Sequence, residues 1–251
     1  MRFNKLNERP FTTEEYYNDL VAKNCARNGH FKHRNKLILD LLSIVGLRPR
    51  ELCLLSPNHF MSTKGEFSEF LLIESHWSFN GNERPSVLSH DEVQKSFTDY
   101  IKWMVKFGVN SIPGTSYLGI NPNLPILVDD NYKNFGLQSR GKKTSEVAKL
   151  VPQKMNEYIK ELIVKSGLSK DNVGLASFHR TWVINAYRNG GMDIKSIAIL
   201  AGISQETVLN YLAYDPQQYN EIINWFEDKR IKKVKLLESR IKRRKFELNL
   251  S

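Results

Sequence analysis

Residues 180–202 read RTWVINAYRNGGMDIKSIAILAG and place one arginine among apolar residues. With the residues around them, they predict successive helices over 178–189 and 193–201. Arg180 lies inside the apolar part of the first helix, in ASFHRTWVINAY. Because arginine does not lose its proton, an arginine beside a hydrophobic core needs an anion as its partner.

A second arginine with similar neighbours is Arg48, in VGLRPRELCLL. One interpretation is that each arginine pairs with a nearby carboxylate, for instance Arg48 or Arg50 with Glu51. The other interpretation joins both arginines with a candidate tyrosine, Tyr211, and a basic C-terminal segment. That combination indicates a phosphodiester as the shared anion.

The rest of the chain has the pattern of a mainly helical protein. Further helices are expected over 12–25, 32–45, 50–55, 91–107, 145–166 with an interruption near Pro152, 204–213 and 217–247. Two strands, 67–75 and 85–88, flank the turn signal Asn80-Gly81, and 108–135 is expected to be loop. Because strands do not alternate with helices, a TIM barrel and a doubly wound sheet are excluded. The predicted fold class is α+β, mainly helical, with a small antiparallel sheet.

The positive charge of the chain is concentrated near its C-terminus. The formal net charge is +10, and residues 229–245 hold ten Lys or Arg and one Glu. A polyanion is the natural partner of such a segment, and in a cytosol this favours nucleic acid. A solvated basic helix without a dedicated partner is the alternative.

Composition excludes several other classes of protein. No apolar run approaches the roughly 20 residues that span a bilayer, and MRFNKLNERPFTTEEYY lacks the apolar stretch of a signal peptide. The two cysteines cannot form a disulfide framework, which favours a reducing cytosol.

There is no phosphate-binding glycine loop. Cys25, His30 and His33 lie close in sequence, but no second pair of ligands follows them, so no zinc site is expected.

Four segments, taken in order, resemble the tyrosine recombinases, or phage integrases. VGLRPREL resembles the family's first-arginine box, and 180–202 resembles its second, with Gly191, Asp193 and Gly202 at matching positions. ETVLNYLAYDP resembles the segment that carries the nucleophilic tyrosine, and PFTTEEY resembles the start of the catalytic domain. The resemblance implies an N-terminal extension over 1–11, a catalytic domain over 12–216 and a basic helix or tail over 217–251.

By this resemblance the chain is a site-specific recombinase or integrase of a mobile element. Arg48 and Arg180 would hold the scissile phosphate, and Tyr211 would attack it to form a 3′-phosphotyrosyl intermediate, with Tyr214 as the alternative nucleophile. The implied partner is double-stranded DNA, bound with self-association as a dimer or tetramer and without a membrane. No cofactor, neither ATP nor a metal, is implied. The implied location is the cytoplasm, associated with the nucleoid.

The chain departs from the family at the positions that move protons. The family's histidine or lysine three residues before the second arginine is Ser177 here, and His179 lies two residues beyond that position. The family's histidine or tryptophan after the second box is Ile203. The hairpin lysine is absent from residues 78–82, and Lys64 lies earlier. These departures favour an alternative, a DNA-binding protein of the same fold that has lost catalysis.

Basic side chains outside the arginine boxes are expected to contact the DNA backbone. They are Arg140, Lys142 and Lys143 in a loop, and Lys232, Lys233, Arg243 and Arg244 in the tail. An alternative role of the tail is to pack an apolar stripe against a neighbouring protomer, and this interpretation is equally attractive. It consists of Ile231, Val234, Leu237 and Ile241. A third interpretation is an RNA-binding or scaffold protein that works through this tail.

Overall fold

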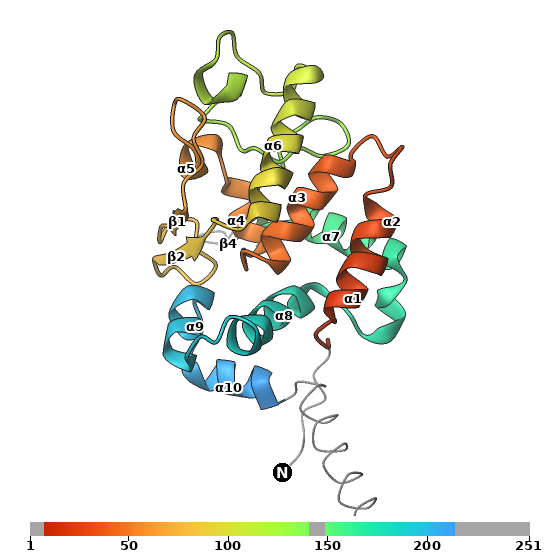
Figure 1. The fold of residues 1–251 in the computed structure, drawn as a ribbon, viewed down its shortest axis with the longest axis vertical. Coiled ribbons are helices and arrows are strands. Elements are labelled where there is room, and N and C mark those ends of the chain that lie inside the picture. Colours follow the sequence, from red (N-terminus) through yellow and green to blue (C-terminus); the bar gives the residue numbers. More distant parts are fainter. Residues whose placement is uncertain (1–7, 141–148, 214–251) are drawn as a thin grey trace, which may run out of the picture. The chain divides into compact units, whose positions relative to one another are not determined.

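The computed structural model describes residues 8–140 and 149–213, which form a mainly helical fold with two small antiparallel sheets (Figure 1). Contacts between backbone positions divide the chain into two units, Met1–Val208 and Leu209–Ser251. All described elements before α10 (Gln205–Ala213) belong to the first unit. In these described ranges, no helix is both long and apolar enough to cross a membrane.

The first helical segment consists of α1 (Thr13–Glu15), the π-helix η1 (Tyr16–Val21) and α2 (Ala22–Asn24). The expected capping box opens it: Thr12 Oγ1 accepts the Glu15 N–H at 3.1 Å, and the Glu15 carboxylate accepts the Thr12 N–H at 2.8 Å. The predicted helix over 12–25 is confirmed. Its middle is a wider π turn, which the sequence pattern did not indicate.

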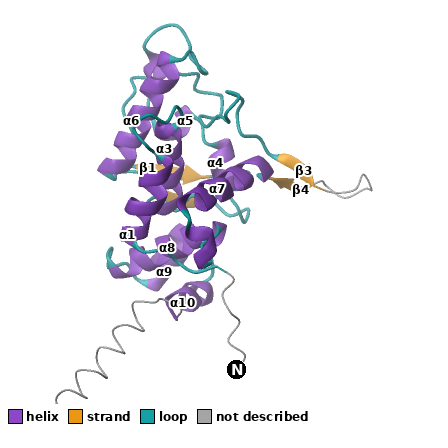
Figure 2. Cartoon of the chain, turned by 90° about the vertical axis from the view of Figure 1, so that its right-hand side faces the viewer, coloured by secondary structure: helices purple, strands orange, loops and turns teal. Residues whose placement is uncertain are grey.

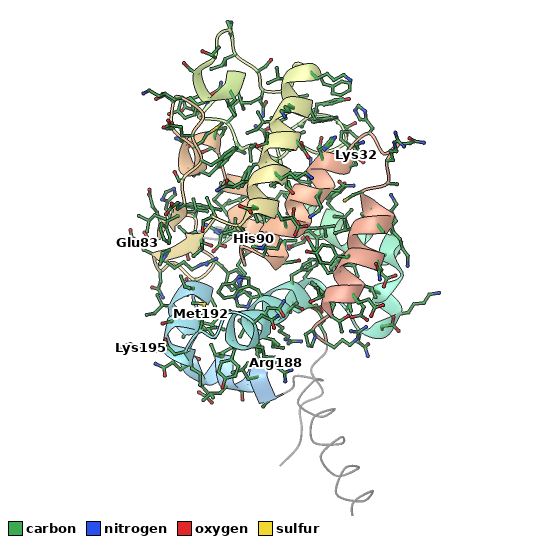
Figure 3. All side chains as sticks on the ribbon, in the orientation of Figure 1. Lys32, Glu83, His90, Arg188, Met192 and Lys195 are labelled. Carbon is green, nitrogen blue, oxygen red and sulfur yellow. The ribbon has the colours of Figure 1, made fainter. Side chains whose placement is uncertain are left out.

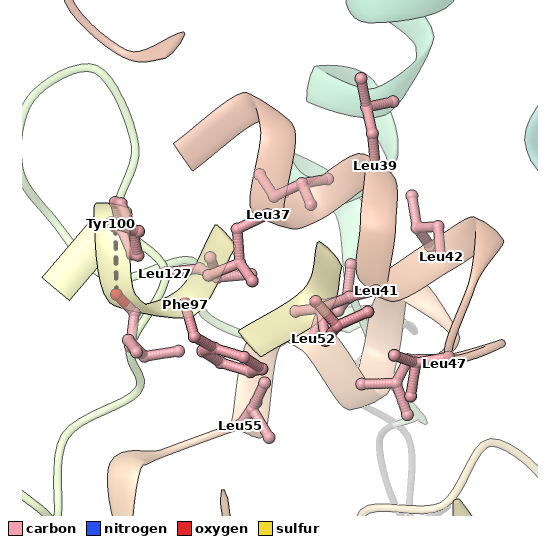
Figure 4. Packing of buried hydrophobic residues seen from close by; sticks show 14 of the residues in the cluster. Leu37, Leu39, Leu41, Leu42, Leu47, Leu52, Leu55, Phe97, Tyr100 and Leu127 are labelled. Atoms are coloured by element: carbon pink, nitrogen blue, oxygen red, sulfur yellow. Dashed lines mark hydrogen bonds between the residues drawn. The ribbon is translucent and has the colours of Figure 1, made fainter. Parts of the chain in front are cut away.

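The hydrophobic core lies where α3 (Lys32–Ser43) packs against α6 (Asp91–Lys106). Leu37 and Leu41 of α3 and Phe97 of α6 are almost fully buried there (Figure 4). Full burial of a side chain of this size stabilises the fold by roughly 1.5–3 kcal/mol. The apolar face predicted for 32–45 is therefore the centre of the core.

The same helix buries a carboxylate, Asp40, which is fully enclosed. Its oxygens accept hydrogen bonds from the hydroxyls of Tyr16 and Ser96 and, at 2.6 Å, from Lys36 Nζ. A buried charge is tolerated when it is paired and hydrogen-bonded in this way. These hydrogen bonds to Asp40 join η1, α3 and α6.

Two short helices and a β-hairpin follow α3. They are α4 (Pro49–Leu54), α5 (Pro57–Phe60), β1 (Phe70–Ile73) and β2 (Arg84–Val87). The strands pair antiparallel, with Leu71 opposite Ser86, and burial alternates along each strand. Gly81 in the connecting turn has φ +77°, the left-handed region that the Asn-Gly signal predicts. Both strands are confirmed, the first being shorter than predicted.

The second sheet corrects the sequence prediction. β3 (Gln138–Arg140) pairs antiparallel with β4 (Lys149–Val151), and α7 (Gln153–Ser166) begins only after Pro152 (Figure 2). The predicted helical start near residue 145 is wrong, because residues 149–151 form a strand. Proline disfavours the helical conformation of the residue before it, so Pro152 separates the strand from the helix.

The C-terminal part of the first unit contains α8 (Leu175–Arg188) and α9 (Ile194–Ala201), after the short η3 (Leu168–Asp171). Asp193 caps α9 by accepting the N–H groups of the second and third residues after it. Gly202, at φ +63°, ends the helix. The helix over 193–201 is confirmed, whereas α8 begins three residues before its predicted start. The predicted loop 108–135 contains one short 3₁₀ turn, η2 (Ser116–Gly119).

Candidate active site

Arg48 is fixed at the start of α4. Its backbone is extended at the N-cap position, and its N–H donates to the Glu51 carboxylate at 2.7 Å. Its guanidinium carbon lies 5.0 Å from the ring centroid of Phe79, in the turn between β1 and β2. A guanidinium over an aromatic face is attracted by the ring quadrupole. The side chain is thus oriented by α4 on one side and by the hairpin turn on the other.

A buried ion pair lies beneath Arg48. Glu51 is fully buried, and its carboxylate accepts Arg84 Nη2 at 2.6 Å and the Phe79 N–H at 3.3 Å. Arg84 also donates to the backbone carbonyls of Gly46 and Leu200. The pair therefore ties β2 to α4, to the end of α9 and to the turn before Arg48.

This ion pair corrects one interpretation of the arginines. The carboxylate of Glu51 is occupied by Arg84, not by the guanidinium of Arg48 or Arg50. Arg50 donates instead to the carbonyls of Leu150 at 2.8 Å and His76 at 3.2 Å. Neither of the pairings suggested by proximity in sequence is formed.

Arg180 lies in the second turn of α8 and is half-buried. Its Nη1 donates to the backbone carbonyl of Glu8. The Glu8 carboxylate in turn accepts the N–H of Ala176 in the first turn of the same helix. A negative charge at this position also interacts favourably with the positive end of the helix dipole. The segment around residue 8 is therefore held against the start of α8, beside Arg180.

His179, next to Arg180, is buried in the first unit. Its Nε2–H donates to the Ala201 carbonyl at 3.2 Å, since a carbonyl can only accept. Its ring stacks on Trp182 with the centroids 6.3 Å apart. Burial lowers the pKa of His179 well below its ordinary value of 6.5, so the imidazole is neutral at pH 7.

The charges that act on His179 bring the two predicted arginines into one region. After burial, the positive charge of Arg48 contributes most to lowering the pKa of His179, and Arg84 and Arg180 lower it further. Such an effect requires all three guanidinium groups to lie within electrostatic range of a single imidazole. Hydrogen bonds give the same connection: Glu51 joins the Arg48 N–H to Arg84, and Arg84 and His179 donate to the neighbouring carbonyls of Leu200 and Ala201. A shared role of Arg48 and Arg180, 132 positions apart in the sequence, stays a prediction.

Two other residues considered for proton transfer, Ser177 and Lys64, are engaged in local structure. Ser177 is buried, and its hydroxyl accepts the Gly174 N–H at 2.9 Å as part of the cap of α8. Lys64 is exposed in a turn, where its N–H donates to Ser62 Oγ at 3.3 Å. Its role as the hairpin lysine stays a prediction.

Tyr211 belongs to the last turn of α10, in the second unit. Its approach to Arg48 and Arg180 stays a prediction. Arg140 was predicted to lie in a loop, but it is the last residue of β3, because its backbone pairs with that of Lys149 in β4. The other predicted site residues lie outside the described ranges; they are Tyr214, Lys142, Lys143, Lys232, Lys233, Arg243 and Arg244.

The predicted absence of a zinc site concerned Cys25, His30 and His33. Within residues 8–140 and 149–213, no group of three or more His, Cys, Asp or Glu side chains is placed to hold a metal ion. His30 Nε2 is instead 2.7 Å from the hydroxyl of Tyr132. Cys25 is half-buried, and burial raises the pKa of its thiol to about 12.

One contributor to the site was not predicted. Glu8 reaches α8 across 168 positions of sequence, and no local pattern indicates that contact. The only related feature in the sequence is the glycine at position 174. In the structure, a Cβ added to Gly174 would lie 2.2 Å from the carboxyl carbon of Glu8, so the contact needs a glycine there.

Comparison with known proteins identifies the fold. No family model matches the chain, and no curated protein is similar to it. The XerA recombinase structure matches with a TM-score of 0.59 and 17% identity, over 87% of this chain and 65% of that one. The XerH site-specific recombinase, bound to a palindromic difH substrate, matches with a TM-score of 0.58 and 15% identity, over 89% and 54%. The chain thus spans between half and two thirds of those structures. The predicted fold class is confirmed: it is that of the tyrosine recombinase catalytic domain.

Proposed function

We propose that this chain cuts and rejoins double-stranded DNA through a 3′-phosphotyrosyl intermediate, with Tyr211 as nucleophile and Arg48 and Arg180 as the clamp on the scissile phosphate. The observation that carries the proposal is a set of hydrogen bonds: the Glu51 carboxylate accepts both the Arg48 N–H and Arg84 Nη2. Arg84 and His179, the neighbour of Arg180, donate to the adjacent carbonyls of Leu200 and Ala201. The context of the proposal is a fold shared with two recombinases. A positive region built from distant arginines is suited to a phosphodiester.

The chemistry assigns distinct tasks to these groups. The Tyr211 oxygen forms a bond to phosphorus while the bond to the 5′-oxygen breaks, and negative charge grows on the non-bridging oxygens. Two guanidinium groups stabilise that charge, an effect worth roughly 10³–10⁵ in rate for an arginine in phosphoryl transfer. The phenol gives up its proton as its oxygen bonds to phosphorus, so the reaction also needs a proton acceptor.

Rejoining follows from the same intermediate. The phosphotyrosyl ester conserves the energy of the broken phosphodiester, so a 5′-hydroxyl can attack it and release the tyrosine. The reaction as written needs no ATP. It does need a proton for the departing 5′-oxygen, delivered by an acid close to the clamp.

A second function, DNA binding without cleavage, is favoured by a specific observation. The Ser177 hydroxyl, at the family's proton-transfer position before the second arginine, is engaged in capping α8. Ile203 has no proton to give, and the hairpin turn SFNGN contains no lysine. A protein of this kind would keep the positive region and hold duplex DNA without forming a covalent bond.

A covalent-adduct assay separates the two functions. The protein is incubated with a pool of nicked duplexes of randomised sequence. Cleavage near a nick releases a short fragment with the 5′-hydroxyl. Because this fragment diffuses away, rejoining is prevented and the phosphotyrosyl adduct accumulates. SDS-resistant adducts are then isolated and their DNA is sequenced. The proposal expects adducts enriched for one sequence, and expects them to disappear in Tyr211→Phe.

Two further variants complete the assay. Tyr187→Phe, an exposed tyrosine on α8, is the matched control and should form adducts normally. Loss of adducts in Tyr214→Phe with retention in Tyr211→Phe would move the nucleophile to Tyr214. Salt-sensitive duplex binding without any adduct would establish the binding function instead.

A further inference from the structure

A pocket of about 410 Å³ lies at the end of α3 that is remote from Arg48. It is formed by the segment from Arg27 to His33 and by the C-terminal half of α6. Figure 3 labels Lys32 at this end of α3, away from α8 and α9, where Arg188 and Lys195 lie. Because α3 has 12 residues, it separates the pocket from the arginine region by roughly 18 Å.

The pocket is positively charged. Its lining includes four cations, Arg27, Lys32, Lys102 and Lys106, and one carboxylate, Asp99. Within the described part of the chain, none of these five forms a salt bridge. Lys32 Nζ is held 2.8 Å from the carbonyl of Arg27. Lys106 Nζ lies over the ring of Phe107, 5.7 Å from its centroid. The lining thus has an excess of positive charge that can attract an anion from solution.

A fixed aromatic group forms another wall of the same pocket. Trp103 is buried, and the ring of Phe107 lies 5.3 Å from it by centroid. The ring of His30 meets both edge-on, at 5.5 Å and 4.9 Å. Phe107 remains 45% exposed although its neighbours restrain it. An exposed ring supported in this way can stack on a planar group at little cost in side-chain entropy.

One buried donor beside the pocket lacks an acceptor, and the N-terminus of α3 lacks a side-chain cap. The indole Nε1–H of Trp103, a residue only 7% exposed, has no acceptor among the described residues. The N-terminus of α3 has Phe31 at its cap, which provides no side-chain hydrogen bond. A buried donor without a partner is unusual in a native protein, and an uncapped helix N-terminus attracts anions.

We infer that this pocket binds a nucleotide, with the phosphate held by Lys32, Lys102 and Lys106 at the N-terminus of α3 and the base stacked on Phe107. Cationic side chains next to exposed aromatic rings are the combination by which proteins bind unpaired nucleotides. The volume lies within the range of small-molecule sites. The inference does not depend on the proposed function, since none of the residues assigned to cleavage lines the pocket.

The test is a fluorescence anisotropy titration of the full-length protein with labelled single-stranded oligothymidylate. Phe107→Ala should weaken binding by about fivefold to a hundredfold, the range that corresponds to stacking one base. It should leave the affinity for an abasic strand of equal length unchanged. The matched control is Val164→Ala, an exposed apolar residue on α7, which should bind both strands normally.

A charge-matched pair of variants controls for the basic C-terminal segment, which every variant retains. Lys102→Glu with Lys106→Glu should weaken binding to oligothymidylate far more than Lys154→Glu with Lys160→Glu, two exposed lysines of α7. Equal losses in the two double variants would overturn the inference. So would unchanged binding in Phe107→Ala.

Competition experiments identify the source of the nucleotide. Displacement by thymidine monophosphate, lost in Phe107→Ala, supports a free nucleotide as ligand; competition by oligothymidylate alone supports a nucleic-acid strand. Displacement by inorganic phosphate as strong as that by thymidine monophosphate would reduce the site to an anion site and overturn the role of the base. Tyr211-dependent adduct formation is measured separately, so failure of one proposal leaves the other standing.

Discussion

At the residue scale, the Glu51–Arg84 pair links most of the segments that surround Arg48. Both side chains are almost completely buried, and the carboxylate also accepts two backbone N–H groups. Removing one partner of such a pair leaves an uncompensated buried charge, which typically costs about 3–5 kcal/mol. We expect Arg84→Gln to lose free energy of unfolding in this range, measured by urea denaturation.

The matched control for this substitution is Arg50→Gln. Arg50 is also an arginine of the α4 region, but it donates only to two backbone carbonyls at exposed positions. Its replacement should cost less than about 1 kcal/mol. If both variants lost the same small amount, the ion pair would not be the link between α4, β2 and α9.

The lowered pKa of His179 predicts how the free energy of unfolding depends on pH. Its pKa in the folded protein lies well below 6.5, so below pH 6.5 the unfolded chain binds a proton that the folded protein does not. The free energy of unfolding should therefore fall as the pH drops from 7 to 5, by at most about 1.4 kcal/mol per pH unit from this group. His179→Gln should remove that part of the slope.

Urea titrations at several pH values, on the parent protein and on His179→Gln, test this prediction through the difference between their free energies of unfolding. Other groups titrate in both proteins and cancel when the two curves are subtracted. Val164→Ala, which replaces an exposed side chain of α7 that does not titrate, should keep the slope of the parent protein. A slope that is unchanged in His179→Gln would mean that neither burial nor the nearby arginines lower the pKa of this imidazole.

At the element scale, the connection from α3 to α4 sets the position of Arg48. Gly46 has φ +76°, and a Cβ added there would lie 2.7 Å from the ring of Trp182 on α8. Gly46→Ala should therefore combine a backbone penalty of about 1–2 kcal/mol with an overpacking penalty of about 1–3 kcal/mol. Both should appear in the free energy of unfolding.

The variant Gly81→Ala is the control that separates the backbone penalty from the overpacking penalty. The φ of Gly81 is nearly the same, +77°, but an added Cβ would meet nothing within 4 Å. Gly81→Ala should therefore lose only the backbone part. Equal losses in the two variants would show that Trp182 moves aside freely and does not hold the turn before Arg48.

The sequence predicted those elements whose ends are determined locally. Asp193 caps α9 and Gly202 ends it within eight residues of chain, so both signals lie in one short segment. The pairing of β3 with β4 joins three-residue strands across a connection, and three residues are too few to show alternation. The same limit applies to the site. Arg48 and Arg180 could be identified from their apolar neighbours, whereas the choice of Arg84 as partner of Glu51 depends on tertiary packing.

At the scale of the whole molecule, charge is distributed unevenly. Residues 229–245 carry nine of the ten net positive charges, so the rest of the chain is close to neutral overall. On the proposed function, Arg48 and Arg180 concentrate positive charge at one place in this nearly neutral part of the chain. On the proposed function, the local region binds one phosphate and the C-terminal segment provides attraction that is independent of DNA sequence.

This division predicts how salt affects DNA binding. The variant that tests it replaces four basic residues with alanine: Lys232, Lys233, Arg243 and Arg244. If each contacts one phosphate, the slope of log K against log salt concentration should become shallower by about 3 to 4, equally for every duplex sequence. Tyr211-dependent adducts should persist at low salt, because the clamp residues are intact. A control that replaces two exposed lysines of α7, Lys154 and Lys160, with alanine should leave the slope unchanged. If the fourfold variant lost all binding together with its sequence preference, recognition would reside in the C-terminal segment, and the clamp would have no part in it.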